Sequence, residues 1–206
     1  FTHVCARLRR CSGGTVGSVA RSGARLLPAL LAGTLALFGG TSMAADIDAL
    51  WDYAKPAESE ARFREELKTE TGDIALEIET QIARTFSMRR DFTRANTVLD
   101  GVAARTSGNT APRVRIRTLL ERGRTLNSSG QFDKAKPLFS DAFQMAQREN
   151  ELLLAIDAAH MFGFSKNLDE AMSWNQVAMR LALTSELPRA IRWRASLANN
   201  MGSTER

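Results

Sequence analysis

A stretch in the middle of the chain, residues 119–147, constrains the fold most, because it has the pattern of two amphipathic helices joined by a tight turn. Gly123 and Leu126 share one face of the first helix. Ser129-Gly130 predicts the turn, since glycine readily adopts the left-handed conformation that ends a helix. The second helix repeats the alternation of small and large residues, at Phe132, Ala135, Phe139 and Ala142. Such a hairpin is apolar on more than one side and predicts neighbouring hairpins that cover it.

The same order of small and large residues recurs on both sides of this hairpin. If Ala135 is taken as the anchor, the equivalent residues are Ala95 and Ala171, which lie 40 residues before and 36 residues after it. A fourth copy opens at residues 199–202, shortly before the last residue of the sequence, Arg206. The matching residues are Ala83, Phe86, Phe92, Ala95 and Leu99 in the first copy, and Ala159, Phe162, Leu168, Ala171 and Ala178 in the third.

With these residues, the region from Asp73 to Arg206 resembles the tetratricopeptide repeat (TPR) family, whose unit is about 34 residues of helix–turn–helix. The resemblance implies an all-α fold, an α-solenoid of antiparallel helix pairs with three repeats and a truncated fourth. The third copy departs from the family pattern, because Asn175 stands where a bulky apolar residue is expected. We expect Trp174 beside it to fill that space.

Residues 1–45 differ from the rest of the chain. Arg21 and Arg25 precede the apolar run LLPALLAGTLALFGG, and small residues follow, as in a secretory signal peptide cleaved after Ala44 or Ala45. This pattern predicts an exported protein, periplasmic or secreted, without a stable membrane span once the leader is removed. The alternative is initiation at Met43, which would place the protein in the cytoplasm.

Residues 46–72 form a lead-in to the repeat array of residues 73–206. We expect one helix from Pro56 to Lys68, because proline is tolerated in a first turn, and we expect it to cap the first repeat. The first repeat should span residues 73–104. Further helices are expected over residues 113–127, 132–148, 151–164 and 169–183, and from residue 188 or 189 to the end of the chain.

Charge and composition argue against several classes of function. Five of the 28 basic residues lie in the leader, and the other 23 balance the 23 acidic residues, so no net basic domain suggests nucleic-acid binding. Both cysteines, Cys5 and Cys11, lie in the leader, so we expect neither a cysteine metal site nor a disulfide framework in the folded part. We also expect no cofactor, since the glycine pairs of the chain lie in the leader.

The search for catalytic residues favours a protein without enzymatic activity. His160 is the one histidine outside the leader, and Asp157 three residues earlier makes only a weak pair with it. A metal centre would need three or four ligands of this kind. An enzyme would require His160, Asp157 and a third polar group in a closed cleft.

The resemblance also implies where a partner would bind, because the first helix of each pair lines the concave surface in this family. The first helix of each copy has a small residue, Ala83, Gly123 or Ala159. Arg84, Arg124 and His160 directly follow these residues, and we call the three the arginine column. The other candidates are Asn127, three residues after Arg124, and Asn199 in the fourth copy. Arginine suits carboxylates, which predicts an acidic or C-terminal segment of another protein as the partner. The alternative is a solvated helix face, or arginines paired with acids of the chain such as Glu121 and Asp91.

The favoured function is therefore a non-enzymatic protein–protein interaction scaffold that presents a concave helical surface to a peptide or protein. The alternative is an accessory or regulatory repeat domain of a longer protein, which the unfinished fourth copy would suit. Self-association is also possible, because a truncated array exposes an apolar end.

Overall fold

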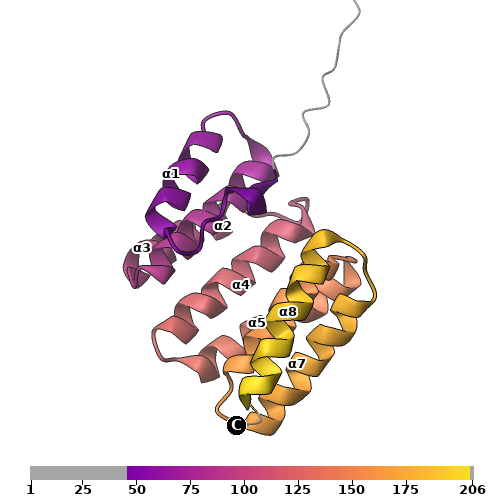
Figure 1. Cartoon of the computed structure of the whole chain (residues 1–206). Coiled ribbons are helices and arrows are strands. Elements are labelled where there is room, and N and C mark those ends of the chain that lie inside the picture. Colours follow the sequence, from indigo (N-terminus) through magenta and orange to yellow (C-terminus); the bar gives the residue numbers. More distant parts are fainter. Residues whose placement is uncertain (1–45, 205–206) are drawn as a thin grey trace, which may run out of the picture. The chain divides into compact units, whose positions relative to one another are not determined.

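Every regular element in the described part of the chain is a helix. The computed structural model describes residues 46–204 of the 206-residue chain, and this range contains no strand (Figure 1). The predicted all-α fold class is therefore confirmed for these residues. The predicted leader, residues 1–45, lies outside the described residues.

The helices follow one another as antiparallel pairs joined by short turns. A 3₁₀ helix, η1 (Ile47–Leu50), and α1 (Pro56–Glu66) come first. The pairs are α2 (Gly72–Met88) with α3 (Phe92–Arg105), α4 (Pro112–Ser128) with α5 (Phe132–Arg148), and α6 (Leu152–Met161) with α7 (Leu168–Leu183), followed by α8 (Pro188–Thr204). The helix expected over residues 151–164 ends at Met161 and continues as a 3₁₀ turn, η2 (Phe162–Phe164). The helix expected to reach Lys68 ends at Glu66.

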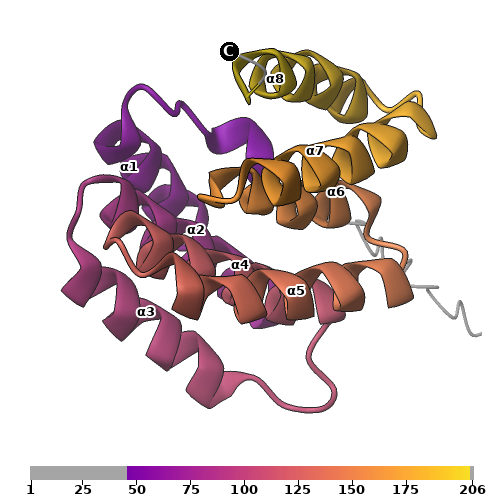
Figure 2. The same cartoon turned by 90° about the horizontal axis from the view of Figure 1, so that it is seen from below.

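Each helix packs against the next one along the chain, and the first helices of successive pairs also touch. Contacts join α2 to α4, α4 to α6, and α6 to α8, while α1 packs on α2. Figures 1 and 2 show this order, from α1–α3 at one end to α7 and α8 at the other. The small residues Ala83, Gly123 and Ala159 lie buried on α2, α4 and α6, where these helices meet their neighbours.

Three of the turns between helices share one backbone geometry. Arg90, Gly130 and Asn150 have positive φ values of 63°, 84° and 58°. In each turn the next residue donates its backbone N–H to the carbonyl five positions earlier in the preceding helix, as from Gln131 to Leu126 at 2.9 Å. This is the Schellman arrangement that satisfies the last carbonyls of a helix. The sequence predicts the turn at Gly130 and a break between residues 148 and 151, where Asn150 adopts this conformation more readily than most side chains do. Arg90 is the position that the sequence does not indicate.

The apolar core consists of separate clusters along the chain, and polar side chains pack in part of the region between them. One large cluster spans α4 to α8, and a second joins η1, α1, α2 and α3. Between them lies only a small group of Leu76, Val102 and Val114. Beside this group the interface of α2 with α4 is built from charged and amide side chains, and these residues form the site described below.

The departure from the repeat pattern in α7 is accommodated as expected. Trp174 stacks on Phe162 with ring centroids 4.2 Å apart and meets the edge of Phe143 at 5.2 Å. Asn175 is fully buried, and neither polar atom of its side chain makes a hydrogen bond of normal geometry within the described residues. The tryptophan therefore supplies the apolar volume, and the asparagine fills the remaining space beside Gly163.

The N-cap of α7 provides a direct test of helix stability. The Asn167 side chain accepts a hydrogen bond from the backbone N–H of Glu170 at 3.0 Å. Asn167→Ala should lower the free energy of unfolding by about 1 kcal/mol, whereas Asn167→Asp should be nearly neutral, because both asparagine and aspartate cap helices well. Urea denaturation of the two variants measures this difference, and equal stabilities would show that the cap contributes nothing.

Candidate functional site

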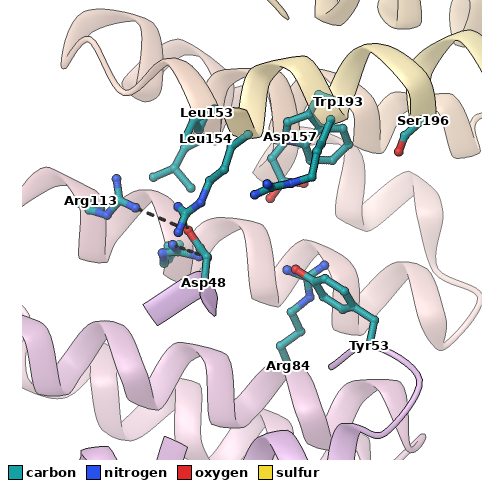
Figure 3. A pocket seen from close by; sticks show the side chains of 12 residues that line it. Asp48, Tyr53, Arg84, Arg113, Leu153, Leu154, Asp157, Trp193 and Ser196 are labelled. Carbon is teal, nitrogen blue, oxygen red and sulfur yellow. Dashed lines mark hydrogen bonds and ion pairs between the residues drawn. The ribbon is translucent and has the colours of Figure 1, made fainter. Parts of the chain in front are cut away.

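A cavity of about 390 Å³ opens beside the first helices of the pairs, between α2, α4, α6 and α8. The segment before α1 also lines it, and we call residues 46–55 the strap. Figure 3 shows Asp48 and Tyr53 of the strap on one side, with Asp157 and Trp193 facing them from α6 and α8. Five arginines and two aspartates provide the charged lining: Arg84, Arg113, Arg117, Arg189, Arg192, Asp48 and Asp157.

Arg84 reaches the cavity from α2 and is held in place by two aromatic rings of the strap. Trp51 and Tyr53 stack with ring centroids 4.9 Å apart, and the Arg84 guanidinium lies 5.2 Å and 5.1 Å from the two centroids. Its ion pair with Glu121 is long, at 3.9 Å, and 19% of its side chain is exposed. Cation–π contacts fix a guanidinium without using its N–H groups, so Arg84 keeps donors available to a ligand.

Arg124 lies next to Arg84 in the predicted arginine column, but its charge is used inside the protein. Its guanidinium donates to Glu121 at 2.7 Å and to Asp157. Burial alone would raise the pKa of the Asp157 carboxyl, but the Arg124 and Arg84 guanidiniums outweigh burial and hold that pKa below its usual value. Arg124 therefore matches the alternative of an arginine paired with acids of the chain, and it stabilises the wall behind the cavity.

A second charged cluster lies at the other end of the cavity, around Asp48. The Asp48 carboxylate accepts from Arg117 of α4 at 2.8 Å and from Arg189 of α8. Arg117, with 4% of its side chain exposed, also donates to Glu77 of α2 at 2.5 Å. One carboxylate of the strap thus connects α4, in the middle of the described chain, with α8, its last helix.

The structure brings two of the five predicted site residues together, but only one of the five, Arg84, lines the cavity. Arg84 and Arg124 meet around Glu121 and Asp157. Asn127 is half-buried near the end of α4, and Asn199 is exposed on α8. His160 packs against Trp193 at 5.1 Å, and its Nδ1 lies 3.1 Å from the Asn200 amide nitrogen. In the part of the chain described, Asp157 bonds to Arg124 and not to His160, so these two residues do not form an acid–base pair.

Sequence reasoning missed the residues of the strap and most of those of α8. Arg189, Arg192 and Ser196 line the cavity from α8, but their role depends on how the last helix folds back over the earlier ones. The alternating acids Asp46 and Asp48 before the first helix were the available signal for the strap.

His160 provides a prediction about pH. Burial lowers its pKa below the usual value, and nearby Asp157 opposes this effect only in part. The folded protein therefore binds fewer protons than the unfolded chain below about pH 6.5, so stability should fall as pH drops through that region. NMR titration of the imidazole should place its midpoint below 6.5, and His160→Gln should remove this part of the pH dependence. A midpoint at or above 6.5 would contradict the burial argument.

The described residues contain no helix long and apolar enough to cross a membrane, and among them no three histidine, cysteine, aspartate or glutamate side chains gather as metal ligands. No protein-family model, curated protein or solved structure matches the chain. The geometry of the cavity is therefore the basis for any functional conclusion.

Proposed function

We propose that residues 46–204 form a tetratricopeptide-like solenoid that acts as a non-enzymatic protein–protein interaction scaffold and binds an acidic peptide segment of a partner. The solenoid arrangement is supported by the order of the helix pairs, by the three turns of equal geometry and by the buried small residues Ala83, Gly123 and Ala159. In such an array the first helices of the pairs form the inner wall, which in this chain comprises α2, α4, α6 and α8.

The observation that carries the proposal is the arginine lining of the cavity. Arg84 from α2 and Arg192 from α8 both line it, and Leu153 and Trp193 add apolar surface beside them. A carboxylate can accept hydrogen bonds from one guanidinium or from both, while a neighbouring apolar side chain packs on the rings. Acidic residues next to an apolar residue would therefore match this wall in charge and in shape.

The test uses the full chain and three sets of short peptides, equal in length and apolar content, that carry acidic, basic or neutral residues. We expect the acidic set to bind best, with affinity that falls as salt is added, because the contact is electrostatic. Fluorescence anisotropy measures the binding. Acidic peptides that bind no better than basic ones would overturn the proposal.

Arg192→Gln is the informative variant for this test, because the side chain of Arg84 also supports Trp51 and Tyr53. Loss of a hydrogen bond to a charged group should weaken binding of the acidic peptides by about tenfold or more. Arg148→Gln is the matched control, since Arg148 is exposed at the end of α5 and does not line the cavity. Equal affinities of the two variants would show that the cavity is not where the peptide binds.

A further inference from the structure

The strap is bound to the inner wall by the contacts that an acidic peptide would make. Asp46 and Asp48 pair with Arg189, and Asp48 also pairs with Arg117. Trp51 follows three residues later and donates its ring N–H to Gln81 of α2 at 3.0 Å. The strap therefore presents two acids and then an aromatic residue to arginine and amide side chains of three different helices.

Its attachment to the wall combines ion pairs with apolar contacts of Ile47, Leu50 and Trp51 to the second core cluster. The Asp46 carboxylate is 63% exposed and that of Asp48 is 27% exposed, so solvent and salt reach both ion pairs. Ile47 is the one buried apolar residue within η1. Tyr53 is 54% exposed although it stacks on Trp51 and contacts Arg84. A segment held in this way opens at a lower free-energy cost than a core helix.

We propose that the strap is a displaceable internal ligand of the inner wall, and that the partner segment carries the same chemistry, two acidic residues followed by an aromatic one, and binds by displacing the strap. The inference takes the inner wall as the binding surface and in that respect rests on the proposed function. It adds the order of residue types that the partner must present, and it explains why a partner peptide should bind weakly while the strap occupies the wall. A tethered segment competes at an effective concentration in the millimolar range, so a free peptide meets the wall only in the fraction of molecules whose strap is open.

The test supplies the strap as a separate peptide, Asp46 to Ala54, with both ends blocked and a fluorophore attached. The receiving protein is the full chain with Asp48→Lys and Trp51→Ala, because a lysine among Arg117 and Arg189 repels and the missing indole removes the contact with Gln81. We expect this release variant to bind the peptide at least about tenfold more tightly than the unmodified chain does. Ala49→Lys is the control in the strap, since Ala49 is exposed, and it should behave like the unmodified chain.

Two results would overturn the internal-ligand proposal: a folded release variant that does not bind the peptide, or an unmodified chain that binds it equally well. These outcomes are separate from failure of the proposed function. If acidic peptides of other sequences bind the unmodified chain but the strap peptide does not bind the release variant, the proposed function stands and the internal-ligand proposal fails. If the strap peptide binds the release variant but the other acidic peptides do not bind the unmodified chain, only the internal-ligand proposal is supported.

Hydrogen exchange on the unmodified chain tests the proposal even where the release variant fails to fold. Backbone amides of residues 47–55 should exchange at least about 100-fold faster than those in the middle of α4, because the strap opens without global unfolding. Salt should increase that difference by screening the ion pairs of Asp46 and Asp48. Strap amides that exchange as slowly as those of α4 would show that the strap is an integral part of the core.

Discussion

Replacing Gly123 by alanine should destabilise the protein by about 2 kcal/mol, although alanine favours a helix more than glycine does. A methyl group on Gly123 would lie 2.7 Å from Cδ1 of Phe139 and 2.9 Å from Cζ of the same ring. The ring is fully buried and meets Phe162 edge to face at 6.2 Å, so it has little room to move. Overpacking at this contact should cost about 3 kcal/mol, the upper end of the usual range, and the helix preference offsets about 1 kcal/mol of it.

Gly101→Ala is the matched control, because Gly101 lies in the middle of α3 and is exposed. A methyl group there would meet only the end of the Arg105 side chain, at 3.9 Å. This substitution should raise the free energy of unfolding by about 0.5–1 kcal/mol through helix preference alone. Urea denaturation of both variants gives the comparison, and a Gly123→Ala variant as stable as Gly101→Ala would show that α4 and α5 do not need the close approach.

A double-mutant cycle would assign the effect to the ring. Phe139→Leu removes Cε1 and Cζ, two of the three ring atoms that the new methyl group would touch, at its own cost of a smaller core side chain. The loss from Gly123→Ala should therefore be smaller in the Phe139→Leu background, with a coupling free energy of about 1 kcal/mol or more. Additive losses would mean that the methyl group disturbs some other neighbour.

Gly123 also illustrates which parts of the fold the sequence can predict. Its small size, the turn at Gly130 and the spacing of Phe132 and Phe139 are local features, and from them the limits of α5 were predicted to the residue. The same logic does not extend to Arg90, because a left-handed backbone is uncommon for arginine and the local sequence gives no sign of it.

The site was less predictable than the helices, because its contacts join distant parts of the chain. Asp48 lies 69 positions before Arg117 and 141 positions before Arg189. Periodicity places Arg84 on the face of α2 toward the next pair of helices, but it cannot show that the strap returns to stack on it. Nor can periodicity distinguish Arg84, which lines the cavity, from Arg124, whose charge is matched by two buried acids.

Asp157→Asn should lower the free energy of unfolding by about 3 kcal/mol. Asp157 and Glu121 both pair with the buried Arg124 guanidinium, and only 13% of the Asp157 side chain is exposed. Removing one partner of a buried ion pair costs about 3–5 kcal/mol, since the other charge stays desolvated. The lower end applies to Asp157 because Glu121 still pairs with Arg124. Asp100→Asn is the control, since Asp100 makes an exposed pair with Arg122, and it should cost at most about 1 kcal/mol.

The dependence on pH gives this prediction a second measurement that a general loss of packing would not reproduce. The neighbouring arginines hold the pKa of Asp157 in the folded protein below its unfolded value of about 3.9, so the unfolded chain binds more protons in acid. The contribution of Asp157 to stability is therefore complete above about pH 4 and is lost as pH falls through the lowered pKa. Denaturation curves recorded between about pH 2 and pH 6 should show that Asp157→Asn loses less stability on acidification than the unmodified protein does. Parallel pH profiles for the two proteins would mean that the Asp157 carboxylate is not stabilised by Arg124.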